Sequence, residues 1–161
     1  MAWVTGFPKG GNMALFSRLR SGGGAPDTTI ARAVLAPAVL TMAADGSVDR
    51  AELVQLNNVC GFSPIFGPLG PETVTRLVNE ILNDLSKRGP HEVITEAAGK
   101  LSPALRETAF CFAMRIAMAD GVLDDGEKAA LSGTATRLEL APETFGKIVD
   151  VVAMMQRPAT A

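Results

Sequence analysis

The chain has 161 residues, a length that favours a single folded domain. Hydrophobic residues make up 47% of it and charged residues 20%, which excludes wholesale disorder. Its 15 basic and 17 acidic residues nearly cancel, so it lacks the basic excess of a nucleic-acid binder. With two cysteines and no apolar run of about 20 residues, we expect a cytoplasmic protein that neither spans a membrane nor relies on disulfides.

Residues 1–26 differ from the rest of the chain. They are rich in glycine, and they contain Lys9, Arg18 and Arg20 but no acidic residue. This composition predicts a flexible Gly-rich tail, followed by a helical domain over residues 27–161. Within the tail, residues 13–20 have the pattern of one or two amphipathic turns, so contact with a membrane or a partner stays open as an alternative.

From residue 27 onward, apolar residues recur at helical spacing. In residues 72–85 and 143–155 they follow the i, i+3, i+4, i+7 pattern, and no window shows the alternation of a strand. The fold class is therefore predicted to be all-α, a compact seven-helix bundle. The predicted helices lie near residues 28–44, 49–60, 71–87, 90–99, 103–119, 124–139 and 142–156.

An internal repeat organises these helices. Residues 45–52 (DGSVDRAE) align with residues 120–127 (DGVLDDGE), and residues 71–79 (PETVTRLVN) align with residues 142–150 (PETFGKIVD). We therefore predict two three-helix repeats joined by a connecting helix over residues 90–99. Two repeats are too few for a solenoid, so we expect them to pack against each other with approximate two-fold symmetry.

The first helix of each repeat is apolar almost all round, which predicts a position in the middle of the bundle. Both cysteines, Cys60 and Cys111, lie in apolar surroundings and are expected to be small core residues. Four methionines at helical spacing are also expected in the core: Met114, Met118, Met154 and Met155.

The repeated motif Asp-Gly-x-[Val/Leu]-Asp-x-x-Glu follows the first helix of each repeat. Its glycine suits the left-handed position after a helix end, and its second Asp with the Glu three residues later forms a capping-box pattern. A tight corner between two helices therefore explains most of the motif without a ligand. The residues are Gly46, Asp49 and Glu52 in the first repeat and Gly121, Asp124 and Glu127 in the second.

Capping does not explain Asp45 and Asp120, because a carboxylate near a helix C-terminus faces the negative end of the helix dipole. With carboxylate oxygens only and neither His nor Cys nearby, each corner is suited to Ca²⁺ or Mg²⁺ rather than zinc. An EF-hand does not fit, because the residues before each Asp are apolar. Three interpretations of the motif stay open: two helix corners without a ligand, one cation site shared by both corners, or a separate cation site at each corner. The candidate ligands are Asp45, Asp49, Glu52, Asp120, Asp124 and Glu127.

Little in the sequence indicates catalysis. His91, the single histidine, follows Gly89 and Pro90 at a predicted helix start, where a solvated residue is expected. There is no nucleophile-elbow motif and no phosphate-binding loop. We therefore predict a protein that is not an enzyme, with a metal-dependent hydrolase at the acidic corners as the less favoured alternative.

The doubled motif, on an all-helical chain of this length, resembles the TerB family of tellurite-resistance proteins over about residues 27–157. The resemblance implies a seven-helix fold and a cytoplasmic stress-response protein, placed in part at the inner face of the membrane. It also implies the six acidic corner residues as divalent-cation ligands, and an inner-membrane TerC-type protein as a partner. A structural helical adaptor without a metal site remains the alternative.

Overall fold

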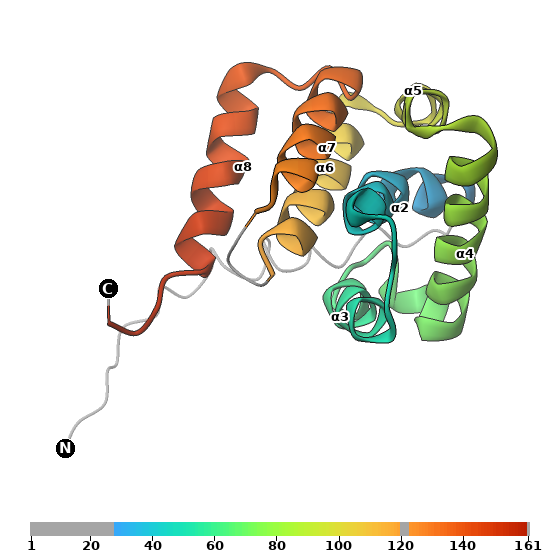
Figure 1. The fold of residues 1–161 in the computed structure, drawn as a ribbon, viewed down its shortest axis with the longest axis horizontal. Coiled ribbons are helices and arrows are strands. Elements are labelled where there is room, and N and C mark those ends of the chain that lie inside the picture. Colours follow the sequence, from blue (N-terminus) through green and yellow to red (C-terminus); the bar gives the residue numbers. More distant parts are fainter. Residues whose placement is uncertain (1–27, 120–122, 161) are drawn as a thin grey trace, which may run out of the picture.

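The computed structural model describes residues 28–119 and 123–160 of the chain. Within these ranges the protein is all-α, with seven α-helices and no strand (Figure 1). Two 3₁₀ helices, η1 (Ala43–Asp45) and η2 (Gly67–Leu69), interrupt the connections. The α-helices are α2 (Thr28–Met42), α3 (Arg50–Gly61), α4 (Gly70–Arg88), α5 (Pro90–Lys100), α6 (Pro103–Ala117), α7 (Asp125–Arg137) and α8 (Pro142–Met155).

The seven predicted helices are confirmed, and their ends agree with the sequence-based bounds to within about two residues. The agreement has a local cause, because α4, α5, α6 and α8 each carry proline in the first turn, where its missing N–H costs no hydrogen bond. The two-fold arrangement of repeats stays a prediction. The predicted tail, residues 1–26, lies outside the described residues.

Helices α2 and α6 form the centre of the bundle. They make the most extensive helix–helix contact of the described elements, with α4 and α5 beyond α2 and with α7 and α8 beyond α6 (Figure 1). Most of α2 is buried, including Val34, Leu35 and Val39 at 0% exposure, as expected for a helix that is apolar all round. Helix α6 buries only one face, so the same expectation is wrong for the rest of that helix.

The core has two parts that meet at α6. One cluster of buried side chains gathers α2, α3, α4 and α5, and the other gathers α6, α7 and α8. Phe112 of α6 packs edge-on against Phe66 of the first cluster, with ring centroids 5.1 Å apart. Phe110, two residues earlier and so on the opposite side of α6, packs against Phe145 of α8, with ring centroids 5.4 Å apart. Helix α6 therefore joins the two halves through aromatic contacts on opposite faces.

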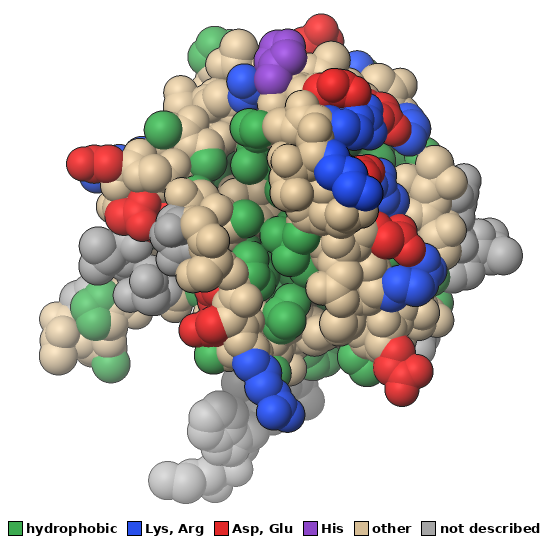
Figure 2. Space-filling view, turned by 45° about the vertical axis from the view of Figure 1, so that its right-hand side comes forward, with side chains coloured by type: hydrophobic (Ala, Val, Ile, Leu, Met, Phe, Trp, Pro, Cys, Tyr) green, Lys and Arg blue, Asp and Glu red, His purple; other side chains and the backbone are tan. Residues whose placement is uncertain are grey.

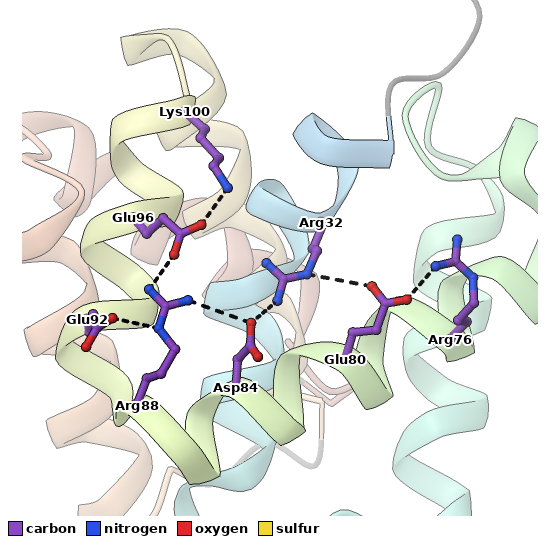
Figure 3. Close-up of polar contacts among 8 residues, drawn as sticks. All are labelled: Arg32, Arg76, Glu80, Asp84, Arg88, Glu92, Glu96 and Lys100. Carbon is purple, nitrogen blue, oxygen red and sulfur yellow. Dashed lines mark hydrogen bonds and ion pairs between the residues drawn. The ribbon is translucent and has the colours of Figure 1, made fainter.

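A chain of ion pairs ties α2 to α4 and α5 (Figure 3). Arg32 of α2 contacts Asp84 and Glu80 of α4, and Arg88 at the end of α4 contacts Glu96 of α5. The space-filling view shows basic and acidic side chains interleaved at the upper right of its face (Figure 2). The network has as many cations as carboxylates: Arg32, Arg76, Arg88 and Lys100 alternate with Glu80, Asp84, Glu92 and Glu96.

The network also perturbs the acidity of its members. Hydrogen bonds from Lys100 and Arg88 lower the pKa of Glu96 from its ordinary 4.5 to about 2. Hydrogen bonds to Glu96 and Glu92 raise the pKa of Arg88. Among the described residues, no helix is both long enough and apolar enough to cross a membrane.

Candidate functional site

The first acidic corner begins where α2 tightens into η1 and ends. Gly46 has φ of 96° and its N–H donates to the carbonyl of Ala43 at 3.0 Å, so the left-handed position predicted for this glycine is confirmed. A side chain there would strain the backbone, which explains why the motif carries glycine. The turn delivers Asp49 to the N-cap of α3.

Asp49 and Glu52 form the capping box that the sequence predicts. An Asp49 carboxylate oxygen accepts from the Glu52 N–H at 2.8 Å, and the Asp49 N–H donates to Glu52 Oε2 at 2.7 Å. Each of these two carboxylates therefore holds one exposed N–H at the start of α3. Val48, which precedes the cap, packs against the first core cluster and fixes the angle at which the chain enters the helix.

The second corner repeats this geometry at the start of α7. Asp124 accepts from the Glu127 N–H at 2.7 Å, and its own N–H donates to Glu127 Oε2 at 2.9 Å. The capping prediction is thus confirmed in both repeats. Gly121 and Asp120 lie outside the described residues. Asp125, which replaces Arg50 of the first repeat, is exposed and pairs with Lys128 at 3.5 Å.

The two corners lie next to each other. A Cβ atom on Gly126, in the first turn of α7, would stand 3.4 Å from the carbonyl oxygen of Ala44 and 3.2 Å from Asp124 Oδ1. The backbone of one corner therefore rests against the helix start of the other. Glycine at position 126 fits this close approach, whereas the equivalent residue of the first repeat is Ala51.

Acidic side chains of both corners line one hollow of about 460 Å³. Asp49 and Glu52 reach it from the start of α3, and Glu127 reaches it from α7. Its remaining lining is mixed, with Met42 and Ile116 as apolar neighbours. The described parts of the two corners therefore share one concave surface instead of pointing to opposite ends of the bundle.

The described acids do not form a metal-ligand set by themselves. In residues 28–119 and 123–160, no three Asp, Glu, His or Cys side chains are grouped so that they could hold a metal ion. Two of the six predicted ligands, Asp120 and the side chain of Asp45, lie outside the described part of the chain. The predicted cation site at Asp45, Asp49, Glu52, Asp120, Asp124 and Glu127 stays a prediction.

The cysteines have different environments, which corrects one expectation. Cys60 is buried, and desolvation raises the pKa of its thiol to about 12, as suits an inert core residue. Cys111 lies on the exposed face of α6, so its assignment to the core is wrong. Partial desolvation and the nearby charge of Glu107 raise the pKa of Cys111.

Two of the four methionines expected in the core are also exposed. Met114 is buried and Met118 packs on the second cluster, whereas Met154 and Met155 are 53% and 54% exposed. The apolar stripe of α8 is wider than the surface of α6 available to cover it. The width of an apolar stripe is only a weak sequence signal for an exposed apolar face, because periodicity does not show which neighbouring helix is present to cover it.

His91 lies in the first turn of α5 and is exposed, as predicted. Its Nδ1 accepts a hydrogen bond from Arg137 Nε at 3.0 Å. The contact connects α5 with the end of α7. The histidine therefore has a structural role between two helices, well separated in the chain from the acidic corners.

The fold and the site define the class: an all-α bundle in which capping boxes close two helix corners that lie against each other. The family model described as "Tellurite resistance protein TerB" matches residues 31–150. The chain belongs to the TerB family, as the sequence resemblance implied. Neither the curated proteins nor the solved structures gave a match.

Proposed function

We propose that this protein is a non-enzymatic stress-response module of the tellurite-resistance type, which binds a divalent cation at its acidic corners and docks onto another protein in the cytoplasm. The observation that carries the proposal is the shared hollow lined by Asp49, Glu52 and Glu127. The hollow draws carboxylates from both repeats, and a Ca²⁺ or Mg²⁺ ion held there would neutralise their charge.

The capping boxes leave oxygen atoms for such an ion. The caps occupy one carboxylate oxygen of Asp49, and Glu52 uses Oε2. Each of these two side chains keeps a second oxygen, and a ligand that is already hydrogen-bonded at one oxygen is held in place for the ion. Asp45 and Asp120 would complete the ligand set in this proposal.

Cation binding would act on the contact between the corners. Because a Cβ atom on Gly126 would stand only 3.4 Å from the carbonyl oxygen of Ala44, tightening one corner would move the start of α7. The same hollow reaches Gln55 and Asn58 on α3, so the effect extends to a face of the bundle that a partner can contact. An inner-membrane protein of the TerC type, which the family resemblance implies, is the partner we propose.

The capping boxes also favour a second candidate, a helical adaptor in which the acids only close the helix corners. This candidate predicts that Asp45→Asn is neutral or slightly stabilising, because it removes a charge from the unfavourable end of the helix dipole. It also predicts no specific response to Ca²⁺ or Mg²⁺.

A titration of the full chain with Ca²⁺ and with Mg²⁺, followed by ¹⁵N–¹H NMR and calorimetry, separates the two candidates. We expect saturable shifts at residues of both corners, which the double variant Asp45→Asn/Asp120→Asn abolishes. The variant Glu72→Gln/Asp150→Asn is the matched control, since it removes the same charge from exposed positions away from the corners. Wild-type protein with no saturable shift would contradict cation binding and leave the adaptor.

The non-enzymatic part of the proposal has its own test. A screen of phosphoester, ester and peptide substrates with Mg²⁺ and Mn²⁺ should show no turnover. Turnover that requires metal and is lost in Asp45→Asn/Asp120→Asn would favour the metal-dependent hydrolase instead.

A further inference from the structure

A groove runs along the side of the bundle away from the ion-pair network. Helix α6 forms its floor, and α3 and α8 form its walls. Its apolar part has a volume of about 390 Å³. The apolar lining comes from all three helices: Val59, Cys111, Phe112, Ile148, Val151 and Val152, with Met155 at the edge.

The groove continues beyond this apolar part toward the acidic corners. A second hollow shares Val59 and Arg115 with the first, and a third hollow, the acidic one, shares Gln55, Asn58 and Ala119 with the second. From Cys111 to Ala119 the floor extends roughly 12 Å, about two turns of a helix. Its chemistry changes in order along this length, from apolar side chains to Arg115, then to amide side chains, then to carboxylates.

Large apolar side chains stand exposed beside the groove. Phe62, at the end of α3, is 97% exposed and lines the second hollow. Val151, Met154 and Met155 of α8 are each more than half exposed. Exposed apolar residues of this size, gathered along one groove, are typical of a surface that another molecule covers.

Arg115 indicates what kind of molecule this is. Its guanidinium makes one weak hydrogen bond among the described residues, to the sulfur of Met155 at 3.6 Å. Among the described residues it has no carboxylate partner, although Arg32, Arg88 and Arg106 each have one within 2.5 to 2.6 Å. Lys147, also at the groove, is paired with Glu143 at 2.7 Å. A guanidinium on an apolar floor without an anionic partner favours a ligand that brings a carboxylate.

We propose that the groove binds an amphipathic helix of another protein, which places an Asp or Glu of its apolar face opposite Arg115. Side chains at i, i+3, i+4 and i+7 of such a helix fill the apolar part. Met154 and Met155 adapt to its shape, since methionine side chains are flexible and polarisable. Residues 1–26 of this chain contain no acidic residue, so they cannot supply the carboxylate.

The inference rests on the partner-docking part of the proposed function, and it is tested with a phage-displayed library of random segments about 14 residues long, roughly four helical turns, selected against the full chain. We expect enriched sequences with a helical apolar stripe that contains Asp or Glu. Replacing that acid with Gln should weaken binding roughly tenfold. The Val151→Asp variant should abolish binding.

Charge exchange at position 115 gives the sharper result. Selection against Arg115→Glu should enrich Lys or Arg where the wild type selects an acid, whereas Lys87→Glu, the same charge change at an exposed site on α4, should select the wild-type sequences. Thermal melting followed by circular dichroism confirms that each variant is folded. Peptides without the acid, peptides that bind Val151→Asp equally well, or no enriched family would overturn the proposal.

Two further outcomes have separate meanings. A wild-type dimer that Val151→Asp converts to a monomer, measured by light scattering after gel filtration, would assign the groove to a second copy and overturn the proposal. The calcium titration is read independently on wild-type protein. If the selection fails while the calcium response is intact, the docking proposal for the groove is wrong. If the selection succeeds while calcium produces no response, the proposed cation site is wrong.

Discussion

The two long sides of the bundle differ in whether their charged side chains are paired. Along α2, α4 and α5, eight side chains alternate in sign and each has a partner within the chain (Figure 3). Along α3, α6 and α8, an apolar groove opens beside Arg115, which has no carboxylate partner among the described residues. On the first side the charged groups are already paired within the chain, so they offer little to a ligand. On the second side Arg115 and the apolar lining remain available to another molecule.

The largest expected effect concerns the support of the groove floor. Phe66 is 1% exposed and packs edge-on against Phe112, which lines the groove. Phe66→Ala should lower the free energy of unfolding by about 3–5 kcal/mol, because it leaves a cavity between the two halves. The measurement is urea denaturation followed by circular dichroism.

The control lies four residues away on the same connection. Phe62 is 97% exposed, so Phe62→Ser should change the free energy of unfolding by less than about 0.5 kcal/mol. A large loss of stability in Phe62→Ser would contradict the comparison between the sides, since Phe62 would then belong to the core of this chain and not to a docking surface.

An intermediate effect is expected at the helix caps. Asp49→Ala and Asp124→Ala each remove one carboxylate of a capping box and should cost about 1 kcal/mol of unfolding free energy. Asp125→Ala should cost less, because Asp125 is exposed and makes only a loose pair with Lys128. Equal losses in all three variants would mean that general charge at the corner matters more than the capping bonds.

The smallest effect tests the ion-pair side through its pH dependence. Above pH 4.5 Glu96 is ionised in both the folded and the unfolded chain, so its contribution to stability is fully present. As pH falls from about 4.5 to about 2, the unfolded chain takes up the proton first and this contribution is lost. Urea denaturation at pH 7, 4 and 2.5 should therefore show a smaller decline for Glu96→Gln than for wild type.

A variant on α8 is the control for this loss of stability at low pH. Asp150→Asn removes an exposed carboxylate of α8 with no ion pair among the described residues, so its stability should fall with pH as the wild type does. An identical pH dependence for Glu96→Gln and wild type would show that the network on α4 and α5 contributes no measurable stability.

Interactions between near neighbours made the fold predictable. Proline in the first turn, the caps at Asp49 and Asp124, and the left-handed Gly46 act within a few residues of the chain, so their sequence pattern is sufficient. The same locality explains why the capping role of four acidic residues was predictable. It does not extend to Cys111, Met154 and Met155, whose exposure depends on which helix lies opposite.

The sequence by itself determined an all-α chain with seven helices, their ends, and two capped corners, because each of these depends on side chains and backbone groups that are close along the chain. Only the tertiary structure decided that the corners touch, with Gly126 against Ala44, and that α3 and α8 stand apart over α6. An apolar stripe requires burial, but its sequence does not name the surface that buries it. For α8 part of that surface is missing from the described bundle, and the groove is the result.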